Sequence, residues 1–157
     1  MPKIHINRDC TLWPRIEKTV RRAVKAALAD CTRTRSLEVG VLLTEDAEIR
    51  HMNRLYRHRD QATNVLSFAM EEGEELPRKG KKQRLLGDIV LAYETVDREA
   101  AARQIPLEWH VTHLVVHGVL HLRGYDHERS PAEAQRQESR EIAILANLGL
   151  PDPYEMP

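Results

Sequence analysis

The alternation of hydrophobic and polar residues predicts four short strands. Isoleucines alternate with polar residues in Lys3–Asn7, and Leu37–Leu43 repeats the two-residue period of a half-buried strand. Two further apolar runs, Asn64–Phe68 and Leu85–Ala92, also indicate strands. The segment between them, Glu71–Arg84, is rich in charged residues and contains Gly80, so we expect a mobile loop there.

Other segments have the periodicity and the end signals of helices. We expect helices at Trp13–Asp30, at Glu45–Arg57, at Tyr93–Arg103, from Pro106 to the residues before Gly124, and from Ser130 to Gly149. The last begins with Ser130-Pro131-Ala132-Glu133, a capping box with proline in the first turn. Four strands and five helices in this order predict an α+β fold, with the helices packed on a small mixed sheet. The length of 157 residues fits a single domain covering 1–157.

One apolar helix carries histidines at the spacing of a metal site. His117 and His121 stand four residues apart and therefore share a helix face. Gly124 can adopt the left-handed conformation that ends a helix, and this reversal directs His127 back toward the other two. Three imidazoles that leave a fourth position open are typical of a catalytic zinc site. His113 extends the same row, and we expect it to be a hydrogen-bond partner or a core histidine.

The spacing H-x-x-x-H-x-x-G-x-x-H is also that of the metzincin peptidases. Those enzymes carry a glutamate directly after the first histidine as general base. Here that position is Gly118, which has no side chain to move a proton. A peptidase is therefore disfavoured.

Four blocks of the chain resemble the YbeY family of bacterial metal-dependent endoribonucleases. The strongest is His117–His127, H-G-V-L-H-L-R-G-Y-D-H, and the others are Asn53–Phe68, Leu86–Ala92 and Leu148–Tyr154. The resemblance implies a single-strand-specific endoribonuclease of ribosomal RNA maturation. It points to the 3′ end of 16S ribosomal RNA, and to ribosome quality control. The alternative is a non-catalytic ribosome-assembly factor stabilised by zinc.

The resemblance also assigns roles to individual residues. It places Arg57, in the block that begins at Asn53, in the catalytic site, where a guanidinium suits phosphate oxygens. For the metal on His117, His121 and His127 we expect one zinc ion, because three imidazoles suit zinc, although nickel and copper bind such ligands too. The implied partners are ribosomal RNA, the small ribosomal subunit and assembly factors.

Charge and composition are compatible with an RNA partner. The net charge is zero, yet residues 1–36 hold nine basic and three acidic residues, whereas 128–157 hold six acidic and three basic ones. Such asymmetry can give one face an attraction for phosphate, although a solvated basic helix face explains it equally well. No apolar run is long enough for a membrane span, and no signal segment precedes the first strand, so we expect a cytoplasmic protein.

Two acidic residues leave open questions. Asp126, just before His127, can orient an imidazole or cap the turn after Gly124. Asp88 interrupts an apolar strand, where an acid is costly unless paired, so it either bonds backbone or supports the site.

Overall fold

The computed structural model describes residues 1–31, 37–70, 75–78 and 81–155, and its strands form one mixed sheet. The strands are β1 (Lys3–Arg8), β2 (Leu37–Thr44), β3 (Val65–Ala69), β4 (Glu75–Arg78) and β5 (Lys81–Ala92). They follow the order β1-β2-β5-β3, and β4 pairs with β5 off this path. β1 and β5 run parallel to β2, whereas β3 and β4 run antiparallel to β5.

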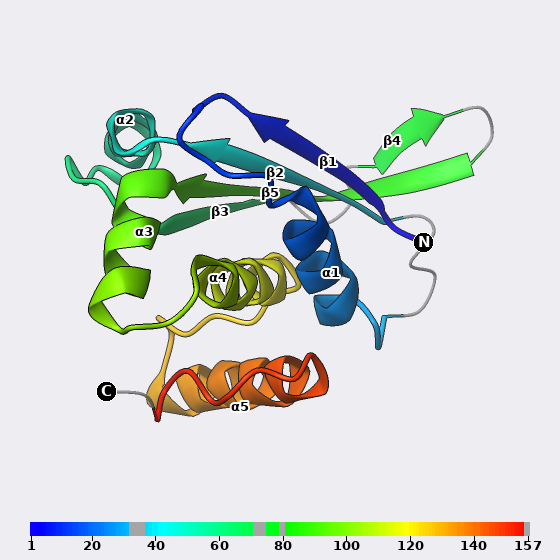
Figure 1. The fold of residues 1–157 in the computed structure, drawn as a ribbon. Coiled ribbons are helices and arrows are strands. Elements are labelled where there is room, and N and C mark those ends of the chain that lie inside the picture. Colours follow the sequence, from blue (N-terminus) through cyan, green and yellow to red (C-terminus); the bar gives the residue numbers. More distant parts are fainter. Residues whose placement is uncertain (32–36, 71–74, 79–80, 156–157) are drawn as a thin grey trace.

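Helices cover both faces of the sheet unequally. They are α1 (Glu17–Ala27), α2 (Asp46–Arg57), α3 (Tyr93–Ala102), α4 (Leu107–Leu122) and α5 (Pro131–Asn147). Helices α1, α3 and α4 lie on one side of the sheet and α2 on the other, while α5 lies beyond α4 (Figure 1). The predicted α+β class, with five helices on a mixed sheet, is confirmed within the described residues.

Strand β5 faces two separate cores. Ile89 and Leu91 are buried in the larger one, with α1 and α4, while Val90 and Ala92 belong to the smaller one beneath α2. Alternate side chains of a strand point to opposite faces, so one apolar run serves both layers. A strand buried on both faces reads as a continuous hydrophobic run, as this one does.

Helix α4 is enclosed by its neighbours. Val115, Val116, Val119 and Leu120 are fully buried, and α4 packs against α1, α3, α5 and the sheet. Polar side chains on such a buried helix need hydrogen-bond partners or a binding site, because an unpaired buried polar group is costly. None of the helices in the described ranges is long and apolar enough to cross a membrane.

Two sequence predictions need correction. The charged segment predicted as a loop contains β4 and the first residues of β5, which pair as a hairpin; residues 71–74 and 79–80 of that prediction lie outside the described part. The first helix begins at Glu17 rather than Trp13. Trp13 instead lies in a turn, is buried, and donates its indole N–H to the carbonyl oxygen of Thr44 at 2.8 Å.

Candidate metal centre

The structure brings the three predicted histidines together. His117 and His121 lie one turn apart on α4, and His127 follows the turn after the helix. The ring of His127 is 4.9 Å from that of His117 and 6.0 Å from that of His121, measured between centroids. Gly124 makes this return possible, because its φ of +102° is costly for any residue with a Cβ.

A carboxylate lies beside two of these histidines, and His117 is not part of the resulting group of three possible ligands. His121, Asp126 and His127 each offer one ligand atom, and these atoms lie within 4.8 Å of one another. Asp126 is already engaged: it accepts a hydrogen bond from the backbone N–H of Glu128 at 2.9 Å and pairs with Arg129 at 3.2 Å. The bond from the Glu128 N–H is the main reason that the pKa of Asp126 is lowered. Of the two roles left open for Asp126, capping the turn is the one observed. One carboxylate oxygen of Asp126 also lies within 4.8 Å of a ring nitrogen of His121 and of His127.

The histidines suit a metal ion electrostatically. Burial lowers the pKa of His121, which keeps its imidazole neutral near pH 7, and a metal requires the neutral form. The Nδ1 atom of His121 is buried and has no hydrogen-bond partner among the described residues. The Nδ1 atoms of His110 and His113 are unpartnered in the described ranges as well, so the fit to a cation rests on the ligand atoms of His121, Asp126 and His127, which lie within 4.8 Å of one another. The residues present therefore fit the metal that the sequence implies.

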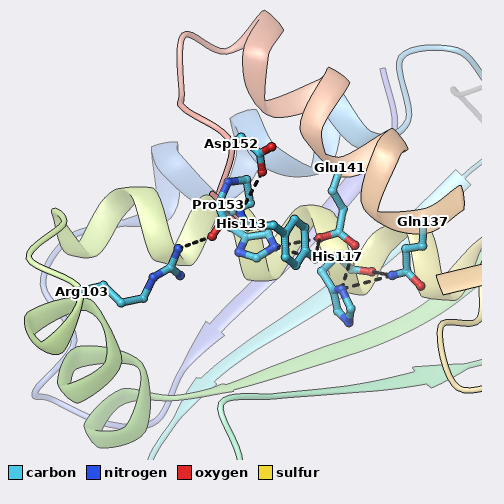
Figure 2. Close-up of polar contacts among 8 residues, drawn as sticks. Arg103, His113, His117, Gln137, Glu141, Asp152 and Pro153 are labelled. Atoms are coloured by element: carbon cyan, nitrogen blue, oxygen red, sulfur yellow. Dashed lines mark hydrogen bonds and ion pairs between the residues drawn. The ribbon is translucent and has the colours of Figure 1, made fainter. Parts of the chain in front are cut away.

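A glutamate that the sequence analysis did not single out holds two of the histidines. Glu141 of α5 is fully buried and accepts from His117 Nδ1 at 3.0 Å and from His113 Nε2 at 2.7 Å (Figure 2). It also accepts a hydrogen bond from the hydroxyl group of Tyr154 at 2.6 Å. Burial raises the pKa of Glu141, but these hydrogen bonds outweigh that effect and bring it down to about 2. His113 is thus a hydrogen-bond partner beside the cluster, as expected from the sequence.

Arg57 lies at the rim of the cluster. It is the last residue of α2, and its Nη2 lies 3.1 and 3.2 Å from the two carboxylate oxygens of Glu128. Glu128 Oε1 lies 3.9 Å from His127 Nε2, so one acid connects the arginine to the histidines. The side chain of Arg57 is 40% exposed and can be reached by a ligand.

Gly118 faces the sheet, away from the histidine cluster. A Cβ there would lie 3.1 Å from both Ile89 Cδ1 and Ser67 Oγ, tighter than ordinary contacts. A glutamate would have to push into β3 and β5 instead of reaching a ligand. The helix thus excludes the peptidase base on steric grounds, in agreement with the sequence argument.

Asp88 does not support the metal centre. It is exposed on the opposite face of the sheet, where it lines a hollow of about 730 Å³ together with Glu38, His5 and Tyr56. Gly40 leaves room for it, because a Cβ on Gly40 would overlap the Asp88 carboxylate. The suggestion that Asp88 supports the site was wrong, since alternate residues of β5 face opposite layers.

Comparisons with known proteins show which family the chain resembles. The sequence profile described as Endoribonuclease YbeY matches residues 5–149. The chain belongs to the YbeY family. It is 58% identical to Endoribonuclease YbeY of Magnetococcus marinus over 122 residues, covering 75% of this chain and 83% of that protein. It is 44% identical to Endoribonuclease YbeY of Bradyrhizobium diazoefficiens over 158 residues, or 98% of this chain and 85% of the relative.

A solved structure shows the same fold. The solution structure of the Thermotoga maritima protein TM1509 aligns with a TM-score of 0.58 and 21% identity, covering 93% of this chain and 91% of the other. The YbeY family is one of metal-dependent nucleases, and in this member His121, Asp126 and His127 bring together three groups that could hold a metal ion.

Proposed function

We propose that this protein is a metal-dependent endoribonuclease that cleaves single-stranded segments of ribosomal RNA. Its substrate would be the 3′ end of 16S ribosomal RNA in the maturing small subunit, with a further role in ribosome quality control. Membership of the YbeY family supports the nuclease activity, and the three converging histidines are the observation that carries the metal dependence. Such a role would place the protein in the cytoplasm, in contact with the small subunit and its assembly factors.

We assign one zinc ion to His117, His121 and His127. The rival set replaces His117 with Asp126. His117 is favoured because its Nδ1 contacts the buried Glu141, which leaves Nε2 as the lone-pair nitrogen, whereas Asp126 is occupied by backbone and Arg129. Three imidazoles suit zinc. When bound there, zinc would supply Lewis-acid chemistry, namely polarisation of phosphoryl oxygens and a lower pKa of bound water.

We assign to Arg57 the binding of the scissile phosphate group. Phosphodiester cleavage builds negative charge on the phosphoryl oxygens, and a fixed guanidinium beside the site stabilises it. Arg57 is held at the rim by Glu128 alone among the described residues, through an exposed ion pair of the kind that contributes about 0–1 kcal/mol. An RNA phosphate can therefore compete for Arg57 at little cost in stability.

A second candidate is a non-catalytic ribosome-assembly factor with structural zinc. One observation favours it: the acids beside the cluster are engaged, Glu141 by three donors, Asp126 by a turn and Glu128 by Arg57. A general base is thus not evident among the described side chains.

Three variants separate these functions. Zinc content, circular dichroism and cleavage of an end-labelled single-stranded RNA are measured for wild type, His121→Ala, Arg57→Ala and the control Arg54→Ala, an exposed arginine on the same helix. We expect His121→Ala to lose zinc and cleavage. Arg57→Ala should keep zinc and fold but cleave about 100-fold more slowly, the usual effect of losing one charge-stabilising donor.

Other outcomes point elsewhere. If Arg57→Ala cleaves as fast as Arg54→Ala, the assignment of Arg57 is wrong. If zinc-loaded wild type cleaves no RNA and His121→Ala unfolds, the assembly factor with structural zinc is the better description.

A further inference from the structure

We propose that Glu141 is a positioning residue of the metal centre, and that Tyr154 of the C-terminal segment fixes Glu141 so that His117 presents Nε2 to the metal. The inference rests on the proposed function only in taking His117 as a ligand. It adds a role for α5 and for the residues that follow it; Glu141 and Tyr154 lie 14 and 27 positions after His127 in sequence.

The burial of Glu141 calls for a reason. A fully buried carboxylate is costly unless hydrogen bonds compensate for its lost hydration, and an apolar side chain would pack α5 on α4 at lower cost. The hydrogen-bond partners of Glu141 are His113, His117 and Tyr154, so its charge is directed at imidazoles and a phenol. The carboxylate points from α5 toward the two rings on α4 (Figure 2).

This contact determines the tautomer of His117. Oε2 of Glu141 lies 3.0 Å from His117 Nδ1, and a carboxylate can only accept, so Nδ1 carries the proton. The amide nitrogen of Gln137 lies 3.2 Å from both His117 Nδ1 and the backbone carbonyl oxygen of His117; it donates to the carbonyl oxygen, because the protonated Nδ1 cannot accept. Nε2 of His117 is then unprotonated and free for a metal. A carboxylate that holds the far nitrogen of a metal-binding histidine also fixes the orientation of the ring.

The other oxygen of Glu141 is held from the opposite side. Oε1 accepts from Tyr154 at 2.6 Å and from His113 Nε2 at 2.7 Å, which leaves Oε2 for His117. With both oxygens occupied, the carboxylate is restrained from rotating away from the metal ligand. The ring of Tyr154 also packs edge-on against His113, with centroids 5.4 Å apart.

The C-terminal segment that carries Tyr154 is itself anchored. Arg103, at the end of α3, donates to the carbonyl oxygen of Pro153 at 2.7 Å (Figure 2). The backbone N–H of Tyr154 donates to Asp152 at 2.8 Å, which closes a local turn. Helices α3, α4 and α5 are therefore linked through one phenol and one carboxylate beside the histidine cluster.

Two conservative variants and a control test this arrangement. Glu141→Gln removes the charge at nearly constant volume, Tyr154→Phe removes only the hydroxyl, and Glu138→Gln alters an exposed acid on the same helix. Zn²⁺ affinity is measured by competition with a chromophoric chelator. The protonated nitrogen of His117 is identified by long-range ¹H–¹⁵N correlation in metal-free protein, a readout that a purely structural role would not change.

We expect Glu141→Gln to bind Zn²⁺ about 10–100-fold more weakly, as is usual when such a partner is removed, and to lose the preference for protonated Nδ1. Tyr154→Phe should weaken binding in the same direction by a smaller factor, and Glu138→Gln should match wild type. Equal affinity and an unchanged tautomer in folded Glu141→Gln would overturn the proposal. If Glu141→Gln does not fold, Tyr154→Phe decides, and wild-type affinity in it counts against the proposal.

Failure of the ligand assignment has a different signature. If His117→Ala binds Zn²⁺ as tightly as wild type, His117 is not a ligand and the ligand set under the proposed function is wrong. In that case the tautomer measurement still decides whether Glu141 orients the ring.

Discussion

Helix α4 forms two glutamate–histidine pairings with opposite patterns of burial. Near its start, His110 contacts Glu99 of α3 at 2.8 Å; the histidine side chain is 5% exposed and the glutamate 38%. Farther along, His113 and His117 contact Glu141 of α5, where the glutamate is 0% exposed and the rings are 13% and 22% exposed. In one pairing the imidazole is the buried partner, and in the other it is the acid.

We interpret this difference as one between a contact that joins helices and a contact that serves the proposed metal centre. Glu99 also accepts a hydrogen bond from Asn64 at 3.0 Å, so it joins the segment before β3 to α3 and α4 while remaining near solvent. Glu141 is fully buried, and one of the rings it holds, that of His117, lies next to the ring of His127. A buried acid that orients partly exposed imidazoles is what a metal centre needs, whereas a buried imidazole beside a solvated acid mainly joins helices.

The largest expected difference is in stability. Glu141→Ala leaves two imidazole N–H groups and a phenol without their buried acceptor, and we expect a loss of about 3 kcal/mol in the free energy of unfolding. Glu99→Ala should cost about 1 kcal/mol, because water can replace a partner that is half-exposed. Urea unfolding of the metal-free proteins measures both. Equal losses of unfolding free energy in Glu141→Ala and Glu99→Ala would show that the difference in burial does not affect stability.

The second expected difference is the pH range in which each pairing loses stability. Burial lowers the pKa of His110, against the raising effect of Glu99 and with smaller lowering effects of His113 and Arg103. As the pH falls below 6.5, His110 therefore binds a proton in the unfolded chain before it does so in the folded protein. The free energy of unfolding decreases from that pH downward. Glu141, with its pKa lowered from 4.5 to about 2, contributes stability above pH 4.5 that is lost as the pH falls toward 2.

His110→Gln tests this separation. The variant should show a flatter dependence of unfolding free energy on pH just below 6.5, with part of the slope remaining because the pKa of His121 is lowered too. The acid loss below pH 4.5 should be unchanged. The matched control is His51→Gln, at an exposed position on α2, and a slope equally flattened by it would refute the role of His110.

Local signals in the sequence predicted the histidines but not the acid that holds them. His117, His121 and His127 lie within one helix and the following turn, so spacing and a glycine were enough. Glu141 reaches them from another helix, and its contact depends on how α5 packs on α4. A signal was present, because Gln137, Glu141, Ile144 and Leu145 form the buried face of α5. An acid on the apolar face of a helix indicates a buried partner.

The fold, like the site, was predictable from the sequence where local patterns determine it. The strand and helix periods identified the elements that pack on the main core. They did not predict the hairpin of β4 with β5, which lies at the end of β5 away from α3 (Figure 1). Its sequence, with Pro77 and the lysines at 81 and 82, has no apolar alternation to mark a strand. Pairing there follows from the extension of β5, which a local pattern cannot reveal.

The smallest effect on stability is expected for Asn64, which contacts Glu99 of the Glu99–His110 pairing. Asn64→Ala removes one hydrogen bond to Glu99, whose other contact with His110 remains, and we expect a loss of about 0.5–1 kcal/mol. Zinc affinity should stay at the wild-type value, because Glu99 and Asn64 do not contact the three histidines of the cluster in the described structure. A double-mutant cycle with Glu99→Ala should show coupling of the same small size, since the two changes remove one shared contact. Weaker zinc binding in Asn64→Ala would mean that the Glu99 pairing also positions the metal centre, and the distinction between the two pairings would be lost.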